Sequence, residues 1–365
     1  MALAPSISTP TTNPSPTLHT VQALRGISAL WVLLYHAQLT QGHTNSWYSS
    51  VVSLGYLGVD LFFVISGFIM AMNTANSPAT AQSSVRFALL RLFRIYSGWW
   101  PVFGLCLLWL TWLSGWPTNK DLLSSFWLIS LNIDTLLLPT TWTLTFELYF
   151  YALIALCLLL PLGSRSMALA LFGTAVLALN IYWISQDRFS PELFEQSHWG
   201  MYLFFSPLCL EFLYGYFSFR WQRHLPAHLG WWLLACVLSG WAIASYALYF
   251  AHKPSGLSGF FHYPERAVLG GLFAACLLGF FLRATAYCPR RLSLWCGDIS
   301  YMLYLLHLPA IWLVNSMALH TSVMLRTLLV IVISLAAATL MHYGVERPIY
   351  SRVRRKLQTR KSAAH

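Results

Sequence analysis

The amino-acid sequence predicts an all-α protein, a polytopic transmembrane helical bundle of about ten helices. Of its 365 residues, 57% are hydrophobic and only 9% are charged, whereas a soluble domain carries about a quarter charged residues. The apolar residues fall into runs of about 20, the length that a helix needs to cross the hydrocarbon layer. Aromatic residues make up 16% and include 17 tryptophans, which is typical of a protein with two interfacial aromatic belts.

The predicted elements follow one another in a simple order. Residues 1–20 are rich in Ser, Thr and Pro and contain no Lys or Arg. We therefore expect a disordered cytoplasmic tail rather than a signal peptide, which would begin with basic residues. Residues 21–350 are expected to form a transmembrane domain, followed by a basic cytoplasmic tail over 351–365. The ten predicted spans are 21–39, 55–73, 97–115, 142–161, 166–185, 199–217, 230–250, 265–283, 297–315 and 323–343.

The apolar segment 122–139 is predicted not to span, because Asn132, Asp134 and Pro139 interrupt it. We expect a re-entrant or interfacial stretch, which surrounding protein can shelter at membrane depth. With the N-terminus inside, seventeen of the Lys and Arg residues fall in inner segments and five in outer ones. Such a bias sets topology, so both termini are expected to be cytoplasmic.

Other classes of protein fit the sequence poorly. The net charge of +11 lies largely in short segments between apolar runs and in the C-terminal tail, so no nucleic-acid partner is expected. The tail is either in contact with anionic membrane lipids or simply solvated. The seven cysteines form no CxxC pair and the histidines have no matching set of ligands, so we expect no metal site.

Ionisable side chains inside a span are costly and therefore informative. Arg25 and His36 lie eleven residues apart in the first span, which places them on nearly the same helix face and about 16 Å apart. A cationic anchor and a general base on one stripe would suit a long substrate with an anionic head. The alternative is an interfacial Arg and a His that is hydrogen-bonded within the bundle.

Two carboxylates are expected near His36 in depth. Asp60 lies in GVDLFFVISGF and Glu147 in WTLTFELYFY, each toward the outer end of its span. Either carboxylate could orient an imidazole and stabilise its cation. The alternative is a pair of interfacial acids that reach water or cap a helix.

A polar stripe is predicted on the ninth span. Ser300, Tyr301, Tyr304 and His307 recur at helical spacing in SYMLYLLHLP and would face protein rather than lipid. A structural hydrogen-bond network explains the stripe as well as a substrate groove does.

The segment RLFRIY contains Arg91 and Arg94 one helical turn apart, before the third span. Two guanidinium groups at this spacing can clamp a phosphate, although positive-inside signalling also explains them. Glu346 precedes Arg347 and is expected to pair with it.

Together these motifs resemble the membrane acyltransferase-3 family of bacterial enzymes that O-acylate cell-envelope and secreted glycans. The resemblance runs from about residue 20 to 350, in the stand-alone form without an SGNH domain. It rests on Arg25 and His36 with ten residues between them, FFVISGF after Asp60, Arg91 and Arg94 followed by Ile95 and Tyr96, WTLTFE ending in Glu147, and SYMLYLLHLP, all in family order.

The resemblance implies transfer of an acyl group, usually acetyl from acetyl-CoA, to a sugar hydroxyl of a lipid-linked or nascent polysaccharide in the bacterial inner membrane. It implies His36 as catalytic base and Arg25, Arg91 and Arg94 as donor-binding residues. We extend the predicted donor site to Tyr96, Arg290 and Arg291, the catalytic group to Glu147 and Asp60, and the supporting group to the stripe that ends at His307.

Two other functions remain open on the sequence. In a proton-coupled exporter of a sugar or lipid-linked intermediate, His36, Asp60 and Glu147 would form a proton relay. A polyprenyl-phosphate-using glycosyltransferase fits less well, because that class usually has a large soluble region and no loop here exceeds about thirty residues.

Overall fold

The computed structural model describes residues 16–41, 47–130, 133–186, 203–222, 224–251, 263–317 and 321–362. These residues form helices and connecting segments, with no strand among them. The main helices are α1 (Pro16–Gln41), α2 (Trp47–Ser53), α3 (Leu57–Thr74), α4 (Ala81–Ser114), α5 (Leu122–Trp127), α6 (Trp142–Cys157), α7 (Leu162–Ser185), α10 (Leu208–Trp221), α11 (Leu229–Ala251), α13 (Pro264–Arg283), α14 (Arg290–Ser316), α15 (Val323–Met341) and α16 (Arg347–Ser362).

The prediction of a polytopic helical membrane protein is confirmed. Within the described residues, seven segments are long and apolar enough to cross a membrane. They are Leu57–Thr74, Pro139–Cys157, Leu162–Ser185, Leu229–Tyr249, Pro264–Arg283, Arg290–Ser316 and Val323–Leu357. The other three predicted spans coincide with α1, α4 and the 14-residue α10, so the total of ten stays a prediction.

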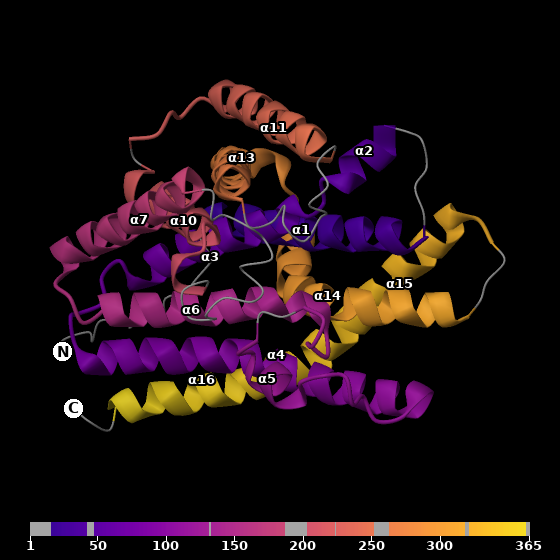
Figure 1. Cartoon of the computed structure of the whole chain (residues 1–365). Coiled ribbons are helices and arrows are strands. Elements are labelled where there is room, and N and C mark those ends of the chain that lie inside the picture. The colour runs from indigo at the N-terminus through magenta and orange to yellow at the C-terminus, as the bar shows by residue number, and fades with distance from the viewer. Residues whose placement is uncertain are drawn as a thin grey trace, which may run out of the picture.

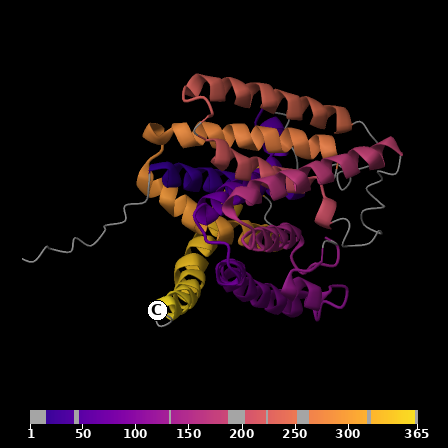
Figure 2. The ribbon, with the colours of Figure 1, turned by 90° about the vertical axis from the view of Figure 1, so that its left-hand side faces the viewer.

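The outer helices carry large apolar side chains that face away from the bundle. Leu171 of α7 is 64% exposed, Trp241 of α11 is 71% exposed and Leu340 of α15 is 74% exposed. In water such surfaces would be unstable, but they match a hydrocarbon surrounding. In Figures 1 and 2, α11 and α16 lie on opposite sides of the bundle.

The segment 122–139 does not span, as predicted from its interrupting residues. Its helix α5 has six residues, and the described residues that follow are irregular up to a 3₁₀ turn at Pro139–Thr141. Leu136, Leu137 and Leu138 are buried. The indole nitrogen of Trp99 in α4 donates to the carbonyl oxygen of Ser125 at 3.0 Å. Protein therefore shelters this non-helical backbone, as membrane depth requires.

Helices α3 and α10 approach closely at two glycines. A Cβ on Gly67 would collide with the carbonyl oxygen of Phe212, and a Cβ on Gly215 would collide with the carbonyl oxygen of Val64. Each glycine thus faces the backbone of the other helix. Small residues allow such close contact between membrane helices.

A buried ionic cluster joins α3, α10 and α13. The guanidinium of Arg266 donates to Asp60 at 2.6 Å and to Glu211 at 3.1 Å. All three side chains are at most 1% exposed. Because charges in hydrocarbon need partners, this cluster fixes which faces of the three helices meet.

The chain ends differ from the prediction in their secondary structure. Helix α1 begins at Pro16, inside the expected tail, and residues 1–15 lie outside the described residues, as does the start of the expected span 199–217. At the other end, α15 continues through a π-helical turn, His342–Glu346, into α16. The expected boundary between 350 and 351 falls inside α16, which lies beside α4 (Figure 1).

Candidate functional site

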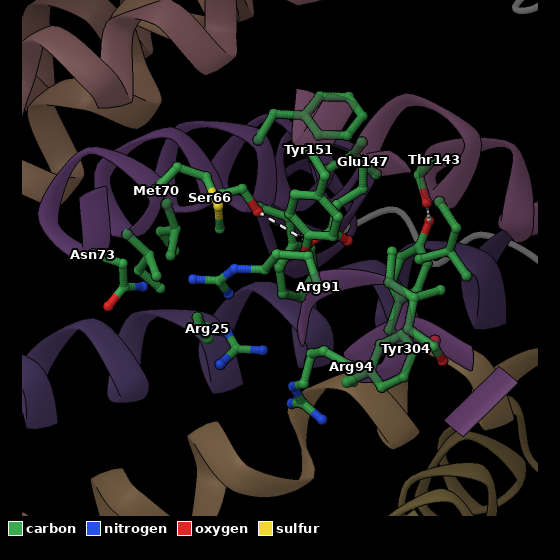
Figure 3. A pocket seen from close by; sticks show the side chains of 18 of the residues that line it. Arg25, Ser66, Met70, Asn73, Arg91, Arg94, Thr143, Glu147, Tyr151 and Tyr304 are labelled. Atoms are coloured by element: carbon green, nitrogen blue, oxygen red, sulfur yellow. Dashed lines mark hydrogen bonds between the residues drawn. The ribbon is translucent and has the colours of Figure 1, made fainter. Parts of the chain in front are cut away.

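A cavity of about 490 Å³ lies in the half of the bundle toward α16. Helices α1, α3, α4, α6, α14 and α16 all contribute to its wall. Its lining combines apolar side chains such as Phe62 and Ile69 with hydroxyl, amide and charged groups. Figure 3 shows Asn73 and Met70 at one end of the cavity and Thr143 and Tyr304 at the other.

Four guanidinium groups line this cavity, from three helices. Arg25 comes from α1, Arg91 and Arg94 come from α4, and Arg354 comes from α16. Figure 3 shows the side chains of Arg25, Arg91 and Arg94 around one space. Glu147 is the one carboxylate among the lining residues. The cavity therefore carries a net positive lining that suits an anionic ligand.

Aromatic rings and one amide hold these arginines. The guanidinium carbon of Arg91 lies 5.5 Å from the ring centre of Phe87 and 5.7 Å from that of Tyr151. Arg25 donates to the side-chain oxygen of Gln22 at 3.2 Å. Cation–π contact stabilises the guanidinium of Arg91 without neutralising it, and the amide of Gln22 is itself uncharged. Both Arg91 and Arg25 therefore keep their charge for a ligand.

Arg94 has an anionic partner, Glu346, which was expected to pair with another arginine. Glu346 forms an ion pair with Arg94 and accepts from Nδ1 of His342 at 2.7 Å. The expected pairing of Glu346 with Arg347 is wrong, because the π-helical turn directs Glu346 toward α4. The guanidinium of Arg347 instead lies over the ring of Tyr343, 5.5 Å from its centre.

Glu147 lies at the cavity wall and is bound by hydroxyl groups. Tyr151, four residues later on α6, donates a short hydrogen bond to its Oε1, and Ser66 of α3 donates to the same oxygen at 3.4 Å. The contact between Tyr151 and Glu147 could be predicted from the sequence, since residues four apart on a helix share a face. No contact of Glu147 with His36 exists among the described residues.

Asp60 does not join the site at which it was expected. The carboxylate is fully buried against Arg266, together with Glu211. The expectation that Asp60 orients the imidazole of His36 is therefore wrong. Hydropathy patterns could not reveal this pairing, since Arg266 lies 206 residues away in the chain.

His36 instead pairs with a second histidine. Nε2 of His307 lies 3.2 Å from Nδ1 of His36, and the two ring centres are 5.0 Å apart. Nδ1 of His307 lies 2.7 Å from the carbonyl oxygen of Tyr304, and Nδ1 of His36 lies 3.0 Å from that of Val32.

These contacts determine the tautomer of both neutral rings. A carbonyl oxygen can only accept, so Nδ1 of His307 carries a hydrogen and its Nε2 is an acceptor. Nδ1 of His36 must then carry the hydrogen that points to Val32 and to His307. Nε2 of His36 is consequently left with an available lone pair, which is what a general base requires.

The histidine pair lies beside the cavity but not on its lining. Tyr304 connects the two: it lines the cavity, and its ring centre lies 5.7 Å from that of His307. Its hydroxyl group contacts Thr143 at 2.9 Å and donates to the carbonyl oxygen of Thr140 at 3.1 Å. Tyr304 thus lines the arginine-lined cavity and also packs against the imidazole of His307.

The predicted polar stripe faces protein, as expected. Ser300, Tyr304 and His307 are buried, and Tyr301 donates to the carbonyl oxygen of Ile95 at 2.8 Å. Tyr301 and Tyr304 also line the cavity. The stripe is therefore part of a hydrogen-bond network and part of the cavity wall, and a role as substrate groove stays a prediction.

Three predicted donor-site residues lie elsewhere. The hydroxyl group of Tyr96 donates to the carbonyl oxygen of Trp127 at 2.8 Å, and its ring stacks on Trp100. Arg290 and Arg291 are exposed at the start of α14. None of the three is among the cavity-lining residues. Sequence reasoning missed Gln22, Ser66, Asn73, Tyr151 and Arg354, which do line it.

Among the residues that the structure describes, no group of His, Cys, Asp or Glu is arranged to hold a metal ion. The seven cysteines are unpaired thiols. The cavity lining offers guanidinium, hydroxyl, amide and carboxylate groups, and the two imidazoles lie beside it.

Residues 18–343 match the family model described as an acyltransferase domain. The chain belongs to the acyltransferase-3 family. This match covers the histidine pair and every cavity-lining residue except Arg354. The family resemblance inferred from the motifs is therefore confirmed. Membership implies acyltransferase activity in a multi-pass membrane protein.

The acyltransferase is also similar to a protein of Rhizobium meliloti (strain 1021), the exopolysaccharide production protein ExoZ. The two are 29% identical over 296 residues, which cover 76% of this chain and 81% of the relative. No solved structure matches the chain.

Proposed function

We propose that the protein is a transmembrane O-acyltransferase that moves an acyl group from cytoplasmic acyl-CoA to a sugar hydroxyl. The acceptor is an envelope glycan or an exopolysaccharide intermediate, either lipid-linked or nascent. The observation that carries the proposal is a cavity lined by four arginines and closed by a tyrosine that touches the His36–His307 pair.

The donor is proposed from the charge of the cavity. An acyl-CoA has a nucleotide with several phosphates at one end and a thioester at the end of a long, flexible arm. Guanidinium groups bind phosphate through charge-assisted hydrogen bonds. Arg25, Arg91 and Arg94 are the proposed phosphate-binding residues, with the arm directed toward Thr143 and Tyr304. Acetyl-CoA is the proposed donor, a choice that rests on the family resemblance.

His36 is the proposed general base. Nε2 of His36 accepts the proton of the sugar hydroxyl as its oxygen attacks the thioester carbonyl carbon. The new C–O bond forms and the C–S bond breaks, and the leaving thiolate receives the proton that the imidazolium of His36 has taken up. Positioning and general-base catalysis supply the rate enhancement without a covalent intermediate.

His307 and Glu147 act in supporting roles in this proposal. His307 accepts from Nδ1 of His36 and so keeps Nε2 available. Glu147 remains a proposed site residue, and its place beside the arginines suits a carboxylate that limits their mutual repulsion. Asp60 is removed from the catalytic group because Arg266 holds it. The same pairing weakens the proton-relay alternative, which needs Asp60 accessible.

The acceptor and the orientation are proposed from the relative and the charge bias. ExoZ is named for exopolysaccharide production, which supports a polysaccharide acceptor. The predominance of basic residues in the expected inner segments supports insertion in a bacterial inner membrane with both termini cytoplasmic.

The proposal is tested with membranes that contain the full-length protein, supplied with labelled acetyl-CoA and analysed for acetylated glycan by mass spectrometry. We expect His36→Ala to lower the rate by about 100- to 10,000-fold while donor binding is kept. Exposed Arg352→Ala serves as a matched control and should keep the wild-type rate. Unchanged acetylation in His36→Ala would refute the base assignment, and flux of sugar without thioester consumption would favour an exporter.

A further inference from the structure

Arg354 has a position that the sequence alone did not suggest. It lies beyond the residues 18–343 that match the family model, in a segment predicted from composition to be a basic tail that is either solvated or in contact with anionic lipids. Yet it lines the same cavity as Arg25, Arg91 and Arg94. It is therefore the one guanidinium of this cavity supplied from outside the family-matching segment.

One turn and two contacts set the position of the helix that carries Arg354. The π-helical turn His342–Glu346 links α15 to α16, and its Glu346 pairs with Arg94 of α4. The guanidinium of Arg94 also lies over the ring of Tyr350, 5.8 Å from its centre. These contacts lie on successive turns of the C-terminal segment, so they fix its rotation as well as its place. Arg354 follows one turn after Tyr350 on a similar face of α16.

Exposure distinguishes the two ends of the cavity. The Arg354 side chain is exposed, whereas Arg25, Arg91 and Arg94 are only partly exposed and Thr143 and Tyr304 are buried. The charge of Arg94 is already matched by Glu346, while Arg354 has no acidic partner among the described ion pairs. An anionic group entering from solvent would therefore meet Arg354 first among the four lining arginines.

We propose that Arg354 binds the phosphate-bearing nucleotide end of the acyl donor at the mouth of the arginine-lined cavity. The proposal rests on the function proposed above, since it takes the donor to be an acyl-CoA. It adds a binding residue from α16 and assigns the donor a direction. The nucleotide lies at the exposed end near Arg354, and the thioester arm runs inward toward Tyr304.

The basic helix provides its own control. Arg352 is exposed, like Arg354, but is not among the cavity-lining residues. Two residues along a helix correspond to a rotation of about 200°, so the two side chains point to nearly opposite sides. Arg352→Gln and Arg354→Gln remove the same charge from the same helix, and only the second removes it from the cavity.

The experiment measures equilibrium binding of acetyl-CoA to the purified full-length protein and to both variants. We expect Arg354→Gln to weaken binding about tenfold, as loss of a charge-assisted phosphate contact does. Arg352→Gln should stay within about twofold, since a remote exposed charge is screened. Arg354→Lys should recover part of the affinity, because it keeps the charge but loses the planar fork.

Acetyl-pantetheine, which lacks the nucleotide, is the second probe. The rate of acetyl transfer from acetyl-pantetheine at saturating acceptor is compared among the wild-type protein and the same variants. Arg354→Gln should leave this rate at the wild-type value. Equal weakening of acetyl-CoA binding by Arg352→Gln and Arg354→Gln would overturn the proposal in favour of general attraction to a basic tail. Wild-type affinity in Arg354→Gln would overturn it while the proposed function stands. Failure of the wild-type protein to bind acetyl-CoA would overturn both.

Discussion

The proposed role of His36 as a base depends on which of its nitrogens carries the hydrogen. Val32 and His307 together occupy Nδ1, so the lone pair remains at Nε2. In many enzymes a carboxylate performs this task and also stabilises the imidazolium. Here the neutral imidazole of His307 takes the place of the carboxylate. It orients the ring of His36 without adding a negative charge in a low-dielectric surrounding.

The contribution of His307 can be measured separately from that of donor binding. We expect His307→Ala to lower kcat by roughly 10- to 100-fold, by analogy with groups that orient a functional imidazole. The affinity for acetyl-CoA should not change, because His307 is not among the cavity-lining residues. The measurement is acyl transfer at saturating donor, paired with equilibrium binding.

Leu308→Ala is the control for this variant, since Leu308 is buried on the same helix without contacting His36 through a hydrogen bond. Loss of donor affinity in His307→Ala, with kcat kept, would contradict a role that acts through His36.

At the residue scale, sequence reasoning succeeded where a motif was local. One cavity is lined by five of the predicted residues, namely Arg25, Arg91, Arg94, Glu147 and Tyr304. They could be predicted because helical spacing and the high energy of polar groups in lipid identify side chains that face the bundle interior. It failed for pairs formed across the bundle. Neither the Asp60–Arg266 contact nor the Arg94–Glu346 contact leaves a periodic signal, since each joins helices that are remote in the chain.

At the scale of elements, the Asp60–Glu211–Arg266 cluster holds three helices together. Each helix contributes one member, and none of the side chains is more than 1% exposed. The cluster adds directional contacts to the apolar packing of α3, α10 and α13, which by itself would allow the helices to rotate. It thereby also positions Ser66 of α3, which donates to Glu147.

Breaking this cluster should be costly. We expect Arg266→Ala to lower the free energy of unfolding by about 3–5 kcal/mol, because two buried carboxylates lose their partner. Thermal unfolding of the protein in detergent provides the measurement. Exposed Arg290→Ala should change stability by less than about 0.5 kcal/mol.

A variant that removes all three charges refines the test. Asp60→Asn, Glu211→Gln and Arg266→Met combined should be more stable than Arg266→Ala alone, because no unpaired charge remains. Wild-type stability of Arg266→Ala would show that the ionic cluster does not determine helix packing.

The hydropathy pattern predicted most helices well and the connecting geometry poorly. Apolar runs of spanning length indicate α7, α11 and α15 directly, since these helices carry many exposed large apolar side chains. The hydropathy pattern does not indicate the π-helical turn His342–Glu346. One additional residue in a helical turn changes the direction of side chains without altering mean hydropathy, so α16 was interpreted as a tail.

At the scale of the whole molecule, the proposed chemistry requires a defined orientation. Arg354, the exposed arginine of the cavity, lies on α16, so a cytoplasmic donor that binds it as proposed requires α16 to lie in the cytoplasm. The link between α13 and α14 is expected on that same side. Its Cys288 is partly exposed and lies outside both adjoining spans.

Labelling of Cys288 tests this orientation. A membrane-impermeant maleimide should modify Cys288 in inside-out vesicles and not in intact cells. Burial raises the pKa of the Cys288 thiol, so less of it is thiolate at neutral pH, and labelling should accelerate as the pH rises.

Cys288→Ser is the control for background reaction. In that background, Asn119→Cys, placed in the exposed link after α4, should react in intact cells. Modification of Cys288 in intact cells would reverse the orientation and with it the side from which a donor could enter.

The π-helical turn also has a consequence for evolution of the cavity mouth. Removing a single residue between His342 and Glu346 would restore ordinary helical spacing and rotate the following basic helix by about 100°. Arg354 would then point away from the cavity, and its place would be taken by another basic residue or left without one. Ligand preference at the entrance could therefore drift through changes in segment length alone, with every residue deeper in the bundle unchanged.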